Sequence, residues 1–126
     1  MKITRFEDIK AWQEARELVT FVYKAINGNK EFGKDFRLVN QSQGSAVSTM
    51  ANVAEGFARK SNKEFIQYLF ISKSSAAEVQ SHLYVALDQK FITEEDFKNI
   101  YDQAEKVSKM DSNFIKYLKT TLNKNK

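Results

Sequence analysis

The 126-residue sequence contains no cysteine and no proline, and it has only four glycines and one histidine. Without cysteine the chain cannot form disulfides, thiol nucleophiles, or zinc and iron–sulfur centres built on thiolates. A single histidine leaves no cluster of residues with metal-ligand spacing, so we expect no metal and no cofactor. Because proline and glycine are the residues that interrupt helices, their scarcity predicts long helices.

The sequence also lacks any apolar run long enough to cross a bilayer, and the first residues, MKITRFEDIKAW, meet a charge every few positions. We therefore expect a cytoplasmic protein with no membrane partner. Hydrophobic residues make up 42% of the chain and charged residues 29%, which is typical of a folded globular protein. A chain of this length is expected to form a single domain, residues 1–126.

Apolar residues recur at alternating spacings of three and four in four segments of the chain. This is the period of a helix that packs along one seam. The GNKEFG segment after the first of these is predicted to be a turn. Short connections favour antiparallel neighbours, so the predicted fold class is all-α, an antiparallel up-down-up-down four-helix bundle. The predicted helices are residues 8–27, 36–56, 62–89 and 94–122.

The expected seam includes Phe36 at the start of the second helix and Asp111 in the fourth. A carboxylate on an apolar seam costs free energy unless it is paired, so Asp111 should either reach water or be buried against a partner such as a lysine or tyrosine. The lone His82 is interpreted as a packing or hydrogen-bonding residue, since Ser75 lies about two helical turns away from it. We therefore identify no catalytic residue.

The stretch NVAEGFARKSNKEF joins the second helix to the third. Gly56 is interpreted as the glycine just after a helix end, where left-handed backbone angles are cheap only for glycine. Ser61 and Glu64 have the S-x-x-E form of a capping box, and Glu55 would pair with Arg59 if the helix continued. Such a joint does not require the basic residues that follow Gly56, so the alternative is that they form a binding site.

This stretch, together with FEDIKAWQEARELV, SKSSAAEVQSHL and FITEEDF, resembles the small bacterial proteins called 23S rRNA-intervening sequence proteins. The resemblance covers nearly the whole chain and implies a four-helix bundle. A related protein is the accessory variability determinant of diversity-generating retroelements, a ring-like homopentamer whose basic surface binds nucleic acid and a reverse transcriptase. For most members the biochemical role is unassigned. The signature residues are Asn52, Glu55, Gly56, Ser61 and Glu64.

The chain departs from the family pattern in the second helix. Members often carry arginines where this chain has Gln43 and Gly44, which removes two basic side chains from the expected surface. Gly44 costs about 1 kcal/mol relative to alanine in mid-helix. With Ser48 and Ala51 on the same face, Gly44 is interpreted as a place where another helix approaches closely.

The third predicted helix carries a second apolar face, about a quarter turn from its seam, that consists of Ile66, Phe70, Ala77 and Tyr84. An exposed apolar stripe usually marks an interface. Phe21 on the first helix is the candidate for the opposite side of a head-to-tail contact that closes into a ring. With the family resemblance, this face predicts a homo-oligomer, a pentameric ring. The alternative is that the bundle buries more of this helix.

The formal net charge of +4 indicates a mild preference for anionic partners. No base-stacking platform accompanies the basic residues, so binding to RNA or DNA should have little sequence preference. A solvated basic face is the alternative reading. The predicted function is a non-enzymatic, homo-oligomeric adaptor associated with nucleic acid, and the competing hypothesis is a structural or protein-binding oligomer. The candidate phosphate contacts are Arg37, Arg59, Lys60, Lys63 and Lys73.

Overall fold

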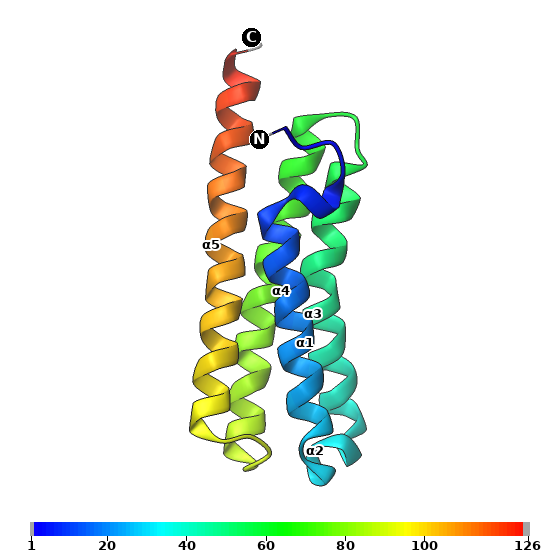
Figure 1. The fold of residues 1–126 in the computed structure, drawn as a ribbon, viewed down its shortest axis with the longest axis vertical. Helices are drawn as coiled ribbons and strands as arrows, with labels where there is room; N and C mark the ends of the chain where they lie inside the picture. Colours follow the sequence, from blue (N-terminus) through cyan, green and yellow to red (C-terminus); the bar gives the residue numbers. More distant parts are fainter. Residues whose placement is uncertain (1, 125–126) are drawn as a thin grey trace.

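Four long helices run alternately up and down in the computed structural model, which describes residues 2–124 and the side chains of residues 2–121 (Figure 1). No strand occurs among these residues, so the predicted all-α antiparallel bundle is confirmed. A short 3-10 turn, η1 (Phe6–Asp8), precedes the first helix, and a five-residue helix, α2 (Lys30–Lys34), follows it. The long helices are α1 (Lys10–Asn27), α3 (Phe36–Phe57), α4 (Asn62–Asp88) and α5 (Glu94–Lys124).

The helices begin where capping residues stand in the sequence. The Asp35 carboxylate accepts a hydrogen bond from the Leu38 N–H at 3.1 Å at the start of α3. The hydroxyl groups of Ser61 and Thr93 accept in the same way at the starts of α4 and α5. Each cap satisfies one backbone N–H that has no partner inside the helix. The four predicted ranges accordingly agree with the observed bounds to within two residues at every end.

The predicted turn at GNKEFG is instead the helix α2. The Asn29 side chain caps it by accepting from the Phe32 N–H at 2.9 Å. Phe32 is only 3% exposed and stacks on Phe91, with the two ring centroids 5.3 Å apart. A helix of little more than one turn has no apolar period to read, which is why its sequence indicated a turn.

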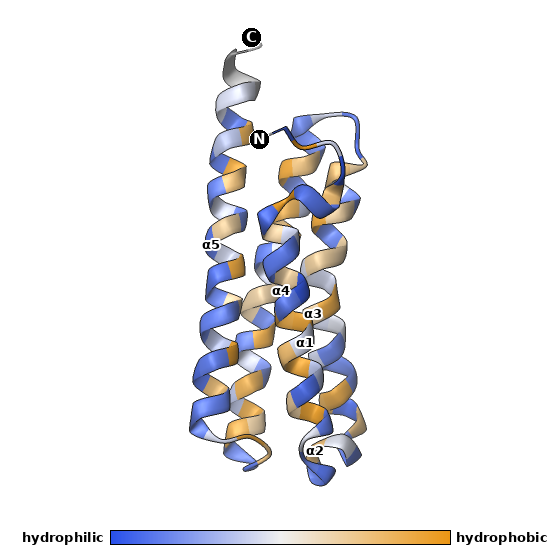
Figure 2. Ribbon diagram, viewed as in Figure 1, coloured by the Kyte–Doolittle hydropathy of each residue, from blue (hydrophilic) through white to orange (hydrophobic). Residues whose placement is uncertain are grey.

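The core consists of two apolar clusters separated by a layer of buried polar side chains. Hydrophobic and hydrophilic residues alternate along each long helix, as a bundle requires (Figure 2). One cluster lies toward the α2 end and includes Leu18, Val79 and Val107. The other lies toward the opposite end and includes Val53 and Leu69. The polar layer between them consists of Thr49, Ser72 and Asp111, each fully buried.

The buried face of α3 differs from the predicted seam at its first residue. Phe36 is 74% exposed, so its assignment to the core is wrong. Leu38, two residues later, is buried instead, and the face continues through Ala46 and Val53. Because Asp35 caps α3, Phe36 is the first residue of the helix, and its side chain stays largely outside the core.

Candidate nucleic-acid interface

The connection between α3 and α4 is built around Gly56, which lies inside the last turn of α3. No glycine of the described chain has a positive φ, so the interpretation of Gly56 as a left-handed residue after the helix is wrong. A Cβ atom at this position would lie 2.7 Å from Cδ1 of Phe65 and 2.8 Å from Cβ of Tyr68. Gly56 is required here because α4 comes too close to α3 for a side chain.

Three other signature residues, Asn52, Ser61 and Glu64, make hydrogen bonds on either side of this connection. The Asn52 amide donates to the Ser48 carbonyl and hydroxyl oxygens, both at 2.9 Å. The Ser61 hydroxyl accepts from the Glu64 N–H at 3.2 Å and donates to the Glu64 carboxylate at 3.3 Å. The predicted cap at Ser61 is thus confirmed, and it satisfies a backbone N–H at the start of α4.

Arg59 is fixed by two neighbours. Its guanidinium donates to Glu55 Oε1 at 2.7 Å, as predicted for a helix that continues past Gly56, and it also donates to the Tyr68 hydroxyl. The guanidinium carbon lies 4.9 Å from the centroid of the Tyr68 ring, within cation–π range. Tyr68, and after it Glu55, raise the pKa of Arg59 above its ordinary value. Arg59 therefore holds the connection and has much of its charge already balanced.

The structure brings together three of the five candidate phosphate contacts. Lys60 and Lys63 are exposed beside Arg59 at the α3–α4 connection. Lys73 lies about three turns further along α4 and is half-buried. Arg37 lies in the first turn of α3, at the opposite end of the bundle (Figure 1). The candidates thus do not form a single surface.

The bundle topology adds basic residues that the candidate set lacks. In an up-down bundle the N-terminal segment, the α3–α4 connection and the last turns of α5 share one end, as Figure 1 shows. This end, which we call the basic end, is defined by the exposed residues Lys2, Arg5, Lys60, Lys63, Lys116 and Lys119. Reading each segment separately left Lys2, Arg5 and the α5 lysines out of the candidate set. The signal that could have found them is the alternation of helix directions.

Three acidic residues of the basic end, Glu7, Asp8 and Glu55, are already engaged by basic side chains or backbone groups of the same chain, whereas the Glu64 carboxylate, among the described residues, meets only the Ser61 hydroxyl. Glu7 pairs with Arg5 at 2.9 Å, and Glu55 pairs with Arg59. Asp8 accepts hydrogen bonds from the backbone and hydroxyl of Thr4 and from the Arg5 N–H, and the first of these contacts is the main reason that the pKa of Asp8 is lowered. In the part of the chain that the structure describes, neither Lys60 nor Lys63 has an ion-pair partner, so their positive charge remains available.

The predicted apolar face of α4 is only partly exposed. Ile66 is buried inside the bundle at 8% exposure, so its assignment to an outer face is wrong. Phe70 and Tyr84 are 44% and 52% exposed, and Ala77 between them is exposed as well. Both rings lean on α5: the Lys119 ammonium lies 5.7 Å from the Phe70 ring centroid, and Tyr84 makes an edge contact with an aromatic ring of α5 at 4.8 Å.

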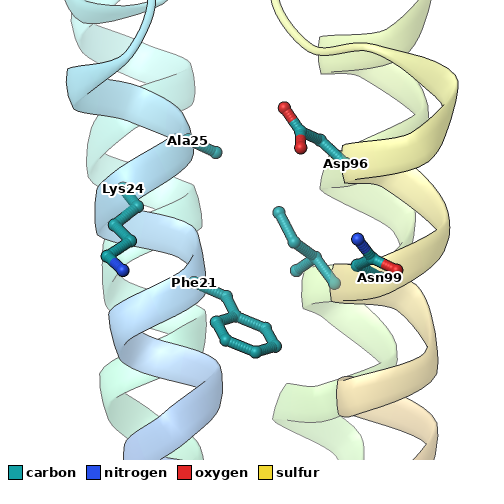
Figure 3. A pocket seen from close by; sticks show the side chains of 6 residues that line it. Phe21, Lys24, Ala25, Asp96 and Asn99 are labelled. Carbon is teal, nitrogen blue, oxygen red and sulfur yellow. The ribbon is translucent and has the colours of Figure 1, made fainter.

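Phe21, the other interface candidate, is half-buried and lines an open cleft between α1 and α5 (Figure 3). Lys24 and Ala25 lie beside it on α1, and Asp96 and Asn99 face them from α5. The cleft has a volume of about 310 Å³. It combines an aromatic wall with one positive and one negative side chain.

His82 does not form a catalytic arrangement with the nearby serine. It lies half-buried in a shallow groove with Ser75 and Glu78. The Ser75 hydroxyl lies 2.8 Å from that of Ser48, so the partner of this serine is another serine. Among the residues that the structure describes, no three His, Asp or Glu side chains come close enough to hold a metal ion.

A family comparison identifies the chain. It matches the 23S rRNA-intervening sequence protein family over residues 7–113, which is most of its length. The chain belongs to this family. The resemblance of the four sequence segments is thereby confirmed.

A solved structure supports the fold of this family member. It is a protein of unknown function from the S23 ribosomal protein family of Bacteroides thetaiotaomicron VPI-5482. The two chains superpose with a TM-score of 0.76 at 24% sequence identity, over 84% of this chain and 98% of that chain. At this identity the likeness shows the fold alone. No curated protein matches the sequence, and none of the helices described is long and apolar enough to span a bilayer.

Proposed function

We propose that this member of the 23S rRNA-intervening sequence protein family is a non-enzymatic adaptor that binds RNA or DNA through its basic end. The observation that carries this proposal is the convergence of three separate segments at one end of the bundle, each bringing exposed basic residues (Figure 1). The carboxylates of Glu7, Asp8 and Glu55 are engaged by Arg5, Arg59 and backbone groups, and Lys60 and Lys63 have no ion-pair partner among the described residues, so they can meet an external anion. A polyanion gains most from such a site because it releases several counterions at once.

The chemistry of the basic end predicts binding by charge with little sequence preference. Lysine ammonium groups contact phosphates as point charges and carry no information about base identity. Lys60 lies in the connection and Lys63 in the first turn of α4, and both are exposed, so their long side chains can reach a phosphate backbone. Arg59 should contribute less than these two lysines because Glu55 and Tyr68 already hold it.

The test is fluorescence anisotropy with labelled single-stranded and double-stranded RNA and DNA at about 50 and 200 mM salt, the range in which counterion release is diagnostic. The double variant Lys60→Glu/Lys63→Glu should bind more weakly. The slope of its log affinity against log salt concentration should be smaller in magnitude by about two, one unit for each lost phosphate contact. Glutamate should be tolerated at position 63, where the helix dipole favours an acid, and at position 60, which is exposed in the connection.

The matched control reverses two charges at the opposite end of the bundle. Lys30→Glu/Arg37→Glu changes the net charge by the same amount, and both residues are exposed in first turns of helices. This control should bind almost as well as the wild type. Equal losses in the two double variants would show that net charge alone governs binding, and no binding at the lower salt would reject a nucleic-acid role.

A second part of the proposal is self-association into a ring, which we place at the half-exposed Phe70 and Tyr84 of one copy and the Phe21 cleft of the next. Two supporting observations are independent of the basic end. Both α4 rings remain about half exposed after packing against α5, and the cleft offers an aromatic wall of its own. A contact between two different surfaces repeats around an axis, and a pentamer is the closure that the family resemblance favours.

A further inference from the structure

The polar layer in the middle of the bundle contains a carboxylic acid with no access to water. Asp111 is 0% exposed, and apolar residues of both clusters, among them Val107 and Ile115, lie one turn away on either side. Its Oδ2 atom lies 2.6 Å from the Ser72 hydroxyl, and its Oδ1 atom has no hydrogen-bond partner. The same Ser72 hydroxyl lies 2.9 Å from the Thr49 carbonyl oxygen. Three helices thus meet at one buried chain of oxygen atoms.

The number of protons that these oxygen atoms share decides whether Asp111 is charged or neutral. The Ser72 hydroxyl carries one hydrogen but lies at hydrogen-bond distance from two oxygens, Asp111 Oδ2 and the Thr49 carbonyl. If Asp111 were ionised, one of these two contacts would join two acceptors with no proton between them. A protonated Asp111 that donates to Ser72, while Ser72 donates to Thr49, gives each contact its own proton. The Oδ1 atom, which has no hydrogen-bond partner, is then a neutral carbonyl oxygen, and burying it costs less free energy than burying a carboxylate oxygen.

The charged groups around the layer do not compensate an ionised Asp111. Lys73 of α4 acts on it, but no ion pair joins the two among the described residues. On α3 the neighbour is Thr49, whose hydroxyl donates to the Ala46 carbonyl at 2.6 Å. On α1, Glu14 faces α5, where Lys106 and a glutamine of α5 engage it.

We propose that Asp111 is held in the folded protein as a neutral acid that donates its proton to Ser72, and that loss of this proton loosens the contact of α5 with α3 and α4. The layer then acts as a pH-sensitive element inside the bundle, closed when protonated and weakened when ionised. This inference does not depend on what the basic end binds.

The direction of the pH dependence follows from burial. Burial raises the pKa of Asp111 from its ordinary value of 3.8 to about 7, while the Ser72 contact and the Lys73 charge act in the opposite direction and are weaker. An acid whose pKa is higher in the folded than in the unfolded protein contributes its full stabilisation at pH values below its unfolded-state pKa. That stabilisation is lost as the pH rises from the unfolded-state pKa toward the folded-state pKa. The unfolding equilibrium constant should therefore rise about tenfold per pH unit in this window from Asp111 alone.

The experiment compares denaturant unfolding of wild type and Asp111→Asn at pH 5 and pH 8. Asparagine keeps the shape of the neutral acid, and its NH₂ group can donate to Ser72 in place of the lost proton. Between these pH values the unfolding constant of the wild type should rise about a hundredfold relative to that of the variant, which corresponds to two pH units. The control Asp88→Asn removes an exposed carboxylate and should track the wild type.

Two results would overturn the proposal. One is an equal pH dependence of wild type and Asp111→Asn, which would mean that the acid is ionised at both pH values. The second test uses wild-type protein alone, so it holds even if the variant fails to fold. In ¹³C-labelled protein, the NMR signal of the Asp111 carboxyl carbon should titrate near pH 7. A midpoint near pH 4 would show an ordinary carboxylate. Amide hydrogen exchange around the layer, faster in wild type than in Asp111→Asn at pH 8, would report the loosening itself.

Discussion

Gly56 and Gly44 both lie inside α3, and the structure separates their roles. A Cβ atom on Gly56 would meet Phe65 and Tyr68 at less than 3 Å, whereas a Cβ atom on Gly44 would have no heavy atom within 4 Å. Gly44 is exposed, so its interpretation as a site of close helix approach is wrong. The close approach is at Gly56.

These two glycines give opposite expected effects for the same substitution. Gly44→Ala should stabilise the fold by about 1 kcal/mol, because alanine is the better helix former and meets no neighbour. Gly56→Ala gains the same propensity but forces α4 away from α3, at an overpacking cost of about 1–3 kcal/mol. The free energies of unfolding in denaturant check this pair. A stabilising Gly56→Ala would show that α4 shifts freely and that the contact is not tight.

At the scale of elements, α2 contributes more than its length suggests. Phe32 fills the end of the core beneath Phe91, whereas Phe36, four residues later, projects into solvent. Phe32→Ala should lower the free energy of unfolding by about 3–5 kcal/mol. Phe36→Ala is the matched control and should change it by no more than about 0.5 kcal/mol. Thermal and denaturant unfolding measure both, and similar losses would contradict the assignment of Phe32 to the core.

The long helices could be predicted from sequence because their period and their caps agree. Asp35, Ser61 and Thr93 stand before apolar periods and cap the helices there. The short α2 could not, since a five-residue helix carries no period. Gly56 was misread because a glycine that ends a helix and one that admits a neighbouring helix look the same in sequence.

The candidate site was predicted residue by residue and not as a surface, because the predicted alternation of helix directions was not applied to it. Lys60 and Lys63 were found because they adjoin a recognisable joint, and Arg37 was grouped with them only by its charge. Sequence distance does not show which end of a bundle a residue occupies. The topology separates Arg37 from the other candidates and brings the N-terminal segment and the last turns of α5 to the basic end (Figure 1).

At the scale of the whole molecule, the ring hypothesis makes a prediction about mass. Phe70→Glu replaces the half-exposed ring of α4 by a carboxylate. It should convert the assembly into folded monomers, because burying an unpaired carboxylate at the contact opposes association. Size-exclusion chromatography with light scattering gives the mass, and circular dichroism checks the fold. The control Tyr117→Glu alters a ring of α5 that is 64% exposed and should keep the assembly. An unchanged mass in Phe70→Glu would reject this face as the contact.

The buried layer of Thr49, Ser72 and Asp111 also has a consequence for the alignment of the helices. Apolar seams of matching period allow α5 to slide along α4 by seven residues and bury similar surface in the new position. Such a slide would set Asp111 against Phe65 or Val79, whose own side chains carry no hydroxyl group to share its proton. The shifted alignments would therefore be destabilised by burial of an acid without a partner, whereas the native alignment is not. The contact of the Asp111 and Ser72 side chains, with the Thr49 backbone carbonyl as the second partner of Ser72, thus favours one register among several that the apolar residues alone would permit.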